Sequence, residues 1–595
     1  MENRRILKSG EFLVEDIESK DIFIPEEFNE EQNMIAQTCR DFLETEIYPN
    51  LDKIDTPDIG LMKSVLKKSG ELGLMGIAIP EEFGGFGQSF LTQMLAAEVI
   101  GAGYSFSVAF MAHCGIGTLP IMYYGNEDQR QRYVTRLATG ELLGAYCLTE
   151  PGAGSDANAG KTNAHLSEDG KFYILNGQKM WITNAGFADI QTVFAKIDND
   201  RVLSAFIVER DTPGVIVNPD EKKMGIKGSS TAQIFYNDVK VPVENLLGKR
   251  GEGFRIALSI LHMGRIKLGA NVLGATKKAV TDSVKYANER KQFGALISTF
   301  GAIKYKLAEQ VIRTFTLESA IYRLSKDIDD QIVMNRNTDG VDYGRAAIEG
   351  ISHYAVEAAL VKVYGSEVLD FVIDEAVQIH GGMGYSAEMP VERGYRDSRI
   401  NRIFEGTNEI NRLLVVDTAM KRALKGDFDL FGMAEKCTQG MDDIKHISGE
   451  GEDYFENKKR AIRSFKQVVL LVIHEASKRF GKKLMDEQEV LNNISDLIIE
   501  VYTTESLMLR VKKMEEMNGM QEKSVYRKIL DVRVYDASQT TRKAGIEILC
   551  SCDITDQTAR LNKAIEILTS GFGVNVKEAR RIIADKLIEN NSYKF

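Results

Sequence analysis

The feature that most constrains the fold is a change of hydrophobic spacing in the N-terminal half of the chain. From Gly144 to about Gly248, short alternating runs replace the helical spacing found on either side. These runs lie at 172–175, 190–195, 203–208, 215–217 and 233–236. Turn residues separate them, as in the segment 167–170, and this pattern is typical of antiparallel strands. The sequence therefore predicts a small antiparallel β domain, or a barrel, between two helical blocks.

The helical blocks complete a multidomain α+β architecture. After the β domain, the spacing predicts long helices at 253–288, 299–326, 341–365, 367–380 and 406–424, and a last group at 456–480, 488–517, 521–549 and 556–589. The predicted parts are an N-terminal arm (1–25), an N-terminal helical domain (26–145), the middle β domain (146–250), a helical-bundle domain (251–426), a connector (427–455) and an extra C-terminal helical domain (456–595).

Composition narrows the classes of partner. At 595 residues the chain is too long for one core, and its net charge of -11 gives nucleic-acid binding no general electrostatic support. An anionic ligand therefore needs a local group of basic residues. Of the six cysteines only Cys550 and Cys552 are near neighbours, and no second pair completes a zinc site, so we expect no metal and reduced thiols.

The sequence also gives expectations about location. Residues 1–12 mix acids and bases and lack the apolar core of a signal peptide, and Glu2 and Glu11 argue against a transit peptide. The longest apolar run, 468–473, is far shorter than the roughly 20 residues that a membrane-spanning helix needs. We therefore expect a soluble, cytoplasmic protein.

The octapeptide 402–409 carries the candidate catalytic residue. Glu405 follows Ile403 and Phe404, whose apolar side chains would raise the pKa of the carboxyl group if they partly bury it. Gly406 lets a ligand approach the backbone, and Thr407 adds a hydroxyl group. These residues suit a general base. On the octapeptide alone, a solvated glutamate at a helix end is an equal alternative.

Two further segments point to a bulky ligand at the β domain. Residues 146–156 contain two glycines, which allow close approach of the backbone, together with Thr149 and Ser155 as hydroxyl donors. Residues 179–184 contain the only tryptophan, Trp181, whose indole offers a flat face, and Thr183 points the same way if the segment is a regular strand. The alternative for the first segment is an ordinary Pro-Gly turn.

Taken in order with Arg290–Gly294, Phe300-Gly301 and 378–385, these segments resemble the acyl-CoA dehydrogenases over about residues 25–425. Each motif alone is weak, whereas five in the right order and domain type are specific. The extension beyond residue 425 resembles the very-long-chain type, which carries an additional helical domain. The last 170 residues are the least similar part.

The resemblance implies a set of site residues. Glu405 is the implied catalytic base. FAD is implied as the cofactor, bound by Tyr146, Leu148, Thr149, Gly154, Ser155, Trp181 and Thr183, with Thr407 and Glu409 closing the pocket. Arg290, Gln292, Phe293, Phe300, Gln378, Gly381 and Gly382 are implied to reach the flavin of a neighbouring subunit. Ser155, Arg265 and Gly406 are the implied substrate contacts, with Arg265 on the CoA moiety.

The implied reaction is the oxidation of an acyl-CoA to a trans-2-enoyl-CoA in fatty-acid β-oxidation, with electrons passed to an electron-transferring flavoprotein. Some relatives place the base at the position of Gly264, which has no side chain here. Ser230 stands where the family commonly has an acid, so contacts there are open. An acyl-CoA oxidase that uses oxygen and an assembly protein of the same fold remain alternatives.

Two finer expectations follow from the resemblance. Val108, Ala109 and Ala112 stand on the helix that floors the acyl pocket, and these small apolar residues favour long acyl chains. The extra domain implies a homodimer, because in very-long-chain relatives it packs where a second dimer would sit. Membrane-surface association is possible but not expected, since the connector segment 441–456 is acidic.

Overall fold

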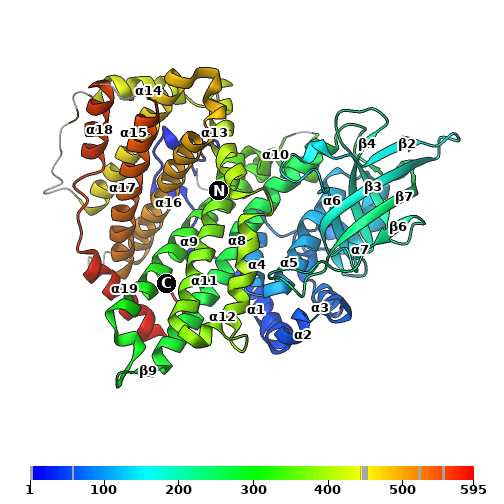
Figure 1. Ribbon diagram of the computed structural model, residues 1–595, viewed down its shortest axis with the longest axis horizontal. Helices are drawn as coiled ribbons and strands as arrows, with labels where there is room; N and C mark the ends of the chain where they lie inside the picture. The colour runs from blue at the N-terminus through cyan, green and yellow to red at the C-terminus, as the bar shows by residue number, and fades with distance from the viewer. Residues whose placement is uncertain are drawn as a thin grey trace.

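The structure is a computed structural model that describes residues 4–56, 59–338, 340–441, 444, 453–519, 524–552 and 556–595. It confirms the predicted succession of helical, β, helical and extra helical parts. In Figure 1 the β domain lies on the right, the long helices of the bundle in the middle, and the extra C-terminal domain on the left.

The N-terminal helices are α1 (Glu30–Phe42), α2 (Leu51–Asp55), α3 (Ile59–Glu71), α4 (Phe90–Gly101), α5 (Tyr104–Ala112), α6 (Leu119–Tyr124) and α7 (Glu127–Ala138). Asn29 starts α1 through a capping box with Gln32, and Asn126 starts α7 in the same way. The segment 104–124 is not one continuous α-helix. A π-helical turn, His113–Gly117, separates α5 from α6, and Pro120 stands in the first turn of α6.

The middle domain is one mixed sheet. Its strands are β1 (Gly144–Cys147), β2 (Asn163–Leu166), β3 (Phe172–Thr183), β4 (Ile190–Ile197), β5 (Ser204–Glu209), β6 (Val215–Val217), β7 (Thr231–Pro242) and β8 (Leu246–Leu247). They lie in the order β6-β7-β3-β2-β4-β5-β8, and β1 pairs with β4. The wholly antiparallel sheet was predicted wrongly, because β1 and β2 both run parallel to β4.

The bundle domain contains α8 (Gly253–Glu289), α9 (Gly301–Arg336), α10 (Tyr343–His353), α11 (Ala355–His380), α12 (Pro390–Ser398) and α13 (Asn408–Leu424), with the hairpin β9 (Lys291–Gln292) and β10 (Ala295–Leu296). The predicted boundary between two helices near residue 366 is wrong, and the boundary lies at Tyr354 instead. Ser366 lies inside α11, where its hydroxyl is satisfied by donating to the carbonyl of Val363 in the preceding turn.

Helices α8 and α11 lie side by side through small residues. A Cβ at Gly269 would lie 3.4 Å from Val361 Cγ2, and a Cβ at Gly365 would lie 3.0 Å from Val272 Cγ2. The two contacts advance in the same direction along both helices, so α8 and α11 run parallel. A position between the two helices can therefore be followed along both of them in the same direction.

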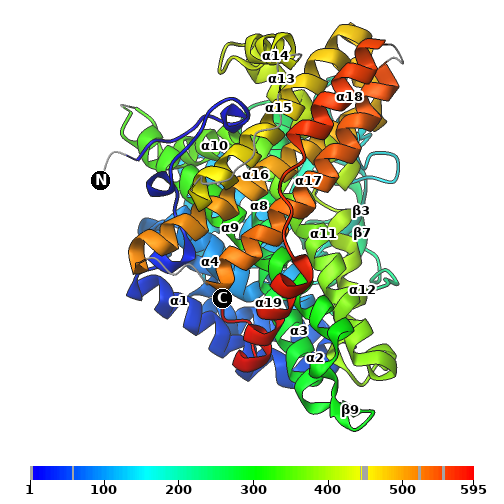
Figure 2. The same cartoon turned by 90° about the vertical axis from the view of Figure 1, so that its left-hand side faces the viewer.

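The extra domain contains α15 (Tyr454–Phe480), α16 (Gln488–Asn518), α17 (Val525–Cys552), α18 (Asp556–Leu568) and α19 (Val576–Asn590). Figure 2 shows these helices in front of the bundle. A preceding helix, α14 (Leu430–Gln439), lies inside the segment predicted as a connector, so part of that segment is helical. Residues 442–443 and 445–452 of the connector, which include four of its acids, lie outside the described residues.

A buried ionic network joins the domains. Arg510 of α16 donates to Glu318 of α9 at 2.8 Å and to Glu26 beside the arm at 2.7 Å. Lys277 of α8 pairs with both Glu318 and Glu98 of α4. The arm also packs Phe12 against Tyr502, with ring centroids 4.9 Å apart. The predicted arm is therefore bound along the extra domain.

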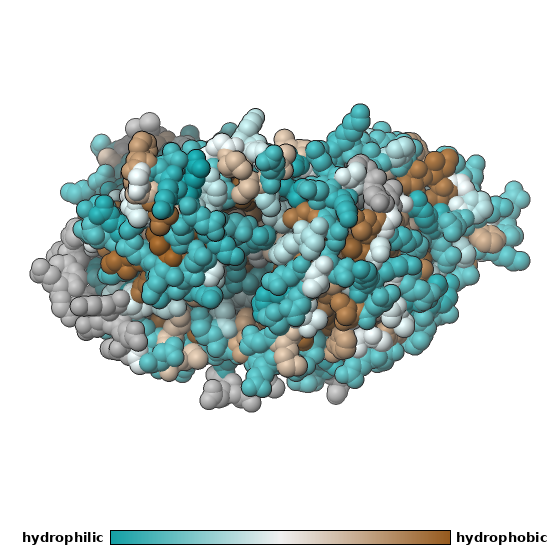
Figure 3. All heavy atoms as spheres, turned by 90° about the horizontal axis from the view of Figure 1, so that it is seen from below, coloured by the Kyte–Doolittle hydropathy of each residue, from teal (hydrophilic) through white to brown (hydrophobic). Residues whose placement is uncertain are grey.

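Two helical stretches, Tyr104–Tyr124 and Gly253–Glu289, are long and apolar enough to cross a membrane, but 78% of the apolar window of each is buried inside the protein. They are core helices of the bundle and its N-terminal neighbour. The face seen in Figure 3 is largely hydrophilic, with apolar side chains in separate groups.

Candidate active site

The predicted base, Glu405, lies against the glycine of α8. A Cβ at Gly264 would lie 2.4 Å from Glu405 Oε2, so the carboxylate occupies the space that any side chain at 264 would need. Glu405 has φ 58° and Gly406 has φ 82°. A left-handed non-glycine residue is rare and costly, and such strain collects at functional sites. The loop therefore holds Glu405 in an enforced conformation just before α13.

The loop carbonyls turn toward buried donors. Arg265 Nε donates to the Glu405 carbonyl at 3.2 Å, and Lys362 Nζ donates to the Gly406 carbonyl at 2.8 Å. The Asn411 amide donates to the carbonyls of Glu405, Gly406 and Thr407. Among the described residues, none accepts a hydrogen bond from the backbone N–H of Glu405, Gly406 or Thr407. These three N–H groups are therefore free to bind a ligand atom.

The surroundings of Glu405 change the pKa of its carboxyl group. Burial raises the pKa of Glu405 to about 7, and the cations Arg265 and Lys362 limit that rise. Glu405 Oε2 is buried and meets no hydrogen-bond partner within the described part of the chain. Burial also lowers the pKa of His262 to about 3, so this neighbour of Arg265 stays neutral. A carboxylate that titrates near neutral pH and is otherwise unengaged suits a general base.

The β domain reaches the same place through Tyr146. Burial first, and the Glu405 carboxylate second, raise the pKa of the Tyr146 phenol well above its ordinary value. Tyr146 is the third residue of β1, followed by Leu148 (7% exposed) and by Thr149, whose carbonyl accepts from Met180 N at 2.9 Å. Tyr146, at the start of the β domain, therefore lies within electrostatic range of Glu405.

Trp181 and the glycine-rich loop form an open cradle beside this strand. Trp181 is 53% exposed with φ 59°, and it lies where the pairing of β3 with β7 is irregular. Regular alternation between Trp181 and Thr183 is therefore absent. A Cβ at Gly152 or Gly154 would meet no atom within 4 Å, and Ser155 is exposed. An exposed indole face beside a loop with free space fits a large planar group.

The other predicted cofactor residues lie at a different place. Arg290, Gln292, Phe293, Gln378, Gly381 and Gly382 are all exposed, and Phe300 is half-buried. They gather at the C-terminal ends of α8 and α11, near the β9 hairpin at the bottom of Figure 1. Phe293 is 97% exposed and packs edge-on against Phe300, with ring centroids 6.2 Å apart. One subunit thus carries two separate groups of predicted cofactor residues.

Three predicted contacts have neighbours that the sequence did not indicate. Arg265, predicted on CoA, is only 3% exposed and holds the Glu405 carbonyl, because this part of α8 is buried. The Thr407 hydroxyl accepts from Ile410 N at 3.3 Å and so caps α13, on which Glu409 is exposed. The acid expected at Ser230 is supplied by Asp220, which accepts from the Ser230 hydroxyl at 2.6 Å.

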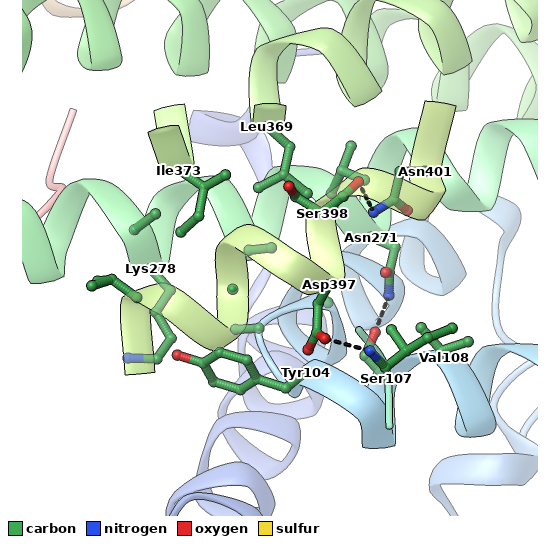
Figure 4. A pocket seen from close by; sticks show the side chains of 18 of the residues that line it. Tyr104, Ser107, Val108, Asn271, Lys278, Leu369, Ile373, Asp397, Ser398 and Asn401 are labelled. Carbon is green, nitrogen blue, oxygen red and sulfur yellow. Dashed lines mark hydrogen bonds between the residues drawn. The ribbon is translucent and has the colours of Figure 1, made fainter. Parts of the chain in front are cut away.

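A mainly apolar cavity lies further along α8 and α11 (Figure 4). Asn271 and Leu369 line it, seven residues after Gly264 and Lys362 respectively, which places it about two turns, or about 10 Å, further along both helices. Its apolar lining includes Ala102, Val108, Val272, Ala275 and Ile373. Val108 lines this cavity, whereas Ala109 is fully buried and its carbonyl accepts from Asn184.

Sequence reasoning missed Lys362 and Asn411. Lys362 is 0% exposed, and its signal was a lone lysine inside the apolar run 358–364. Asn411 follows Glu405 by six residues and carries no signal of its own. Only the folded loop brings its amide under three consecutive carbonyls.

Comparison with known proteins identifies the domains. Family models of the acyl-CoA dehydrogenase N-terminal, middle and C-terminal domains match residues 29–141, 145–239 and 251–420. A further model, also described as acyl-CoA dehydrogenase, C-terminal domain, matches residues 464–565 in the extra domain.

Individual proteins agree with these matches. A probable acyl-CoA dehydrogenase of Bacillus subtilis (strain 168) is 41% identical over 590 residues, 99% of this chain and 98% of that protein. The human very long-chain specific acyl-CoA dehydrogenase, mitochondrial, is 36% identical over 74% of this chain and 69% of its own length. A crystal structure of an acyl-CoA dehydrogenase complexed with FAD from Bacillus anthracis has a TM-score of 0.96 and 42% identity, and covers 99% of this chain and 100% of that one. The chain therefore belongs to the acyl-CoA dehydrogenase family of oxidoreductases, in the form that carries an extra C-terminal helical domain.

Proposed function

We propose that this protein is a cytoplasmic, FAD-dependent acyl-CoA dehydrogenase that oxidises long-chain acyl-CoA to trans-2-enoyl-CoA in fatty-acid β-oxidation. We further propose that its electrons pass to an electron-transferring flavoprotein. The observation that carries the proposal is the carboxylate of Glu405, which is unpartnered at Oε2, titrates near pH 7 and faces the start of the β domain.

The residues around Trp181 fit FAD. The indole is exposed, the backbone at Gly152 and Gly154 is open, and hydroxyl groups stand at Thr149 and Ser155. Trp181 and Thr183 would hold the ring system, and the loop 149–155 would hold the polar part of the cofactor. When bound, FAD supplies a two-electron acceptor for the reaction.

The chain's own chemistry is the removal of a proton. Glu405 Oε2 takes the proton from Cα of the acyl thioester, and the electron pair of that C–H bond becomes part of the new Cα–Cβ double bond. The β-hydrogen leaves with its electron pair, so the substrate loses two electrons and two hydrogens. A carboxyl pKa of about 7 makes Glu405 a stronger base than an exposed glutamate.

The loop backbone can lower the activation free energy of this proton removal. An acyl α-proton is too weakly acidic for a carboxylate unless the thioester oxygen is stabilised as negative charge develops on it. The free N–H groups of Glu405 and Gly406 are the donors that the loop offers for this oxygen. Because Arg265, Lys362 and Asn411 already hold the loop carbonyls, no reorganisation of the loop is needed during the reaction.

The cavity of Figure 4 supports a long acyl chain. It lies about two helical turns beyond the base, and its lining of Val108, Val272 and Ile373 is apolar. Each additional buried methylene contributes roughly 0.8 kcal/mol to binding. Specificity constants measured across a chain-length series should therefore rise with length, whereas a maximum at four to eight carbons would refute the long-chain proposal.

A homodimer would complete the cofactor site. The exposed group around Phe293 and Arg290 lies far from Trp181 in one chain, but a second copy could place it at the flavin. Helices α16 and α19 pack on α9 through the pairs Arg323–Glu505 and Arg580–Glu309, and so they cover a face of the bundle. Light scattering should give a dimer, and a tetramer would refute this assembly.

The decisive experiment uses the purified flavoprotein under anaerobic conditions. A saturated long-chain acyl-CoA should bleach the flavin, and Glu405→Gln should keep the flavin but lose bleaching by several orders of magnitude. Electron-transferring flavoprotein should restore the colour, whereas stoichiometric hydrogen peroxide would identify an oxidase. A wild-type protein that lacks flavin or is not bleached would refute the proposal.

A further inference from the structure

Lys362 is a fully buried cation in an apolar part of α11, between Val361 and Val363. Its ammonium donates to the Gly406 carbonyl at 2.8 Å and to Asn408 Oδ1 at 2.7 Å. Within the described ranges, no carboxylate lies within ion-pair distance of it. A buried lysine whose charge has no anion in contact is unfavourable for stability, so its two hydrogen bonds to the loop and to Asn408 need another explanation than an ion pair.

The position of Lys362 defines the direction of the loop peptides. In a trans peptide the C=O and N–H groups point in opposite directions. Lys362 draws the Gly406 carbonyl toward α11, so the Thr407 N–H points away from α11. Arg265 does the same for the Glu405 carbonyl from α8, which turns the Gly406 N–H outward. The two cations thus fix successive peptides of the loop that carries the base.

We propose that Lys362 is a positioning residue for Glu405: it anchors the Gly406 carbonyl and thereby holds the catalytic loop in its left-handed conformation, while its charge keeps the Glu405 carboxylate available as a base. The inference rests on the proposed function. Lys362 acts through the loop and through its field, and it contacts neither the substrate nor the reacting atoms.

The charged groups around Lys362 and Glu405 determine whether removal of the lysine charge raises or lowers the pKa of Glu405. Arg265 faces Glu405 from α8, Glu367 lies one turn further along α11, and Glu409 faces Lys362 from α13. Burial lowers the pKa of Lys362 to about 7, and Glu405 is the main group that opposes this shift. Removal of the lysine charge takes away one of the two cations that favour ionised Glu405. The pKa of Glu405 should then rise above about 7.

The test compares Lys362→Met with Lys362→Gln, Lys362→Arg and a matched control, Ser366→Ala. Ser366 shares Asn408 Oδ1 with Lys362, at 3.2 Å, but does not touch Gly406. The readout is the infrared carboxyl band of Glu405 in the flavoprotein without substrate, assigned as the band that Glu405→Gln removes. We expect a midpoint near pH 7 in wild type, Lys362→Arg and Ser366→Ala, and at least one pH unit higher in Lys362→Met and Lys362→Gln.

A second readout separates positioning from general structure. At pH 7, Lys362→Met should slow anaerobic flavin bleaching about 100-fold while substrate binding changes little, because a small misplacement of a base has this scale of effect. Lys362→Gln keeps a hydrogen-bond donor for the Gly406 carbonyl, so it should slow bleaching less than Lys362→Met does. A folded variant without the lysine charge, Met or Gln, that titrates and bleaches like wild type would overturn the inference. Failure of wild type to bleach would refute the proposed function alone, since the carboxyl titration needs no substrate.

Discussion

The carboxylate of Glu405 lies directly over the backbone of Gly264, where a Cβ would come within 2.4 Å of Oε2 and 2.8 Å of Oε1. The two residues are 141 positions apart in the sequence, yet each defines the environment of the other. Gly264 leaves the space that the carboxylate fills, and the carboxylate leaves no room for a second base at 264. This complementarity supports the proposal that the base lies in the loop before α13.

Gly264→Ala should abolish most activity in a folded protein. The new methyl group would displace the carboxylate, and we expect a loss of about 100-fold in the rate of flavin bleaching. Gly269→Ala is the matched control on the same helix, because its Cβ would make an ordinary contact of 3.4 Å with Val361. Equal rates in both variants and wild type would show that the carboxylate does not need this space.

The rate of substrate oxidation should rise with pH through about 7. Glu405 must be ionised to accept a proton, and burial raises its pKa to about 7. Arg265 and Lys362 limit this rise. His262 stays neutral with a pKa of about 3 and adds no further step, whereas Lys362, whose pKa burial lowers to about 7, loses its charge over the same range and broadens the transition. Below pH 6 the rate should fall about tenfold per pH unit. Stopped-flow bleaching between pH 5 and 9 measures the midpoint, and a midpoint near 4.5 would contradict the buried base.

Tyr104 should limit the length of the acyl chain. It begins α5 with φ 53°, and its ring reaches across the cavity toward Lys278 (Figure 4). Tyr104→Ala should move the optimum of kcat/KM to longer chains, by about fourfold for each added methylene that becomes buried. Tyr104→Phe keeps the ring and is the control. An unchanged chain-length profile in the alanine variant would mean that the chain ends elsewhere.

Arg510 should stabilise the attachment of the extra domain. It is 1% exposed, pairs with Glu318 and Glu26, and lies 3.8 Å over the ring of Phe315. Arg510→Ala removes one of the two cations on buried Glu318 and the partner of Glu26, and because Lys277 still pairs with Glu318 the cost should be at most about 3 kcal/mol. The urea midpoint should fall clearly. The exposed pair Arg345–Glu349 provides the control, since Arg345→Ala should change stability by less than about 1 kcal/mol.

The sequence by itself determined the architecture and supplied Glu405 as the candidate base. Hydrophobic spacing separated the β domain from the helices, because side-chain periods of about 2 and 3.6 are local properties of strands and helices. The glycine at 264 excluded the alternative base. Spacing did not reveal that β1 and β2 run parallel to β4, since strand direction depends on connections between distant segments.

Only the tertiary structure decided what surrounds Glu405. Arg265, Lys362 and Asn411 come from α8, α11 and α13, and no spacing rule relates them. Their convergence depends on helix packing, which places Arg265, 3% exposed, under the loop. The raised pKa of Glu405 depends on burial, and burial is a property of the assembled fold. The sequence supplies the carboxylate, whereas the fold supplies the burial that raises its pKa into the range suited to a general base.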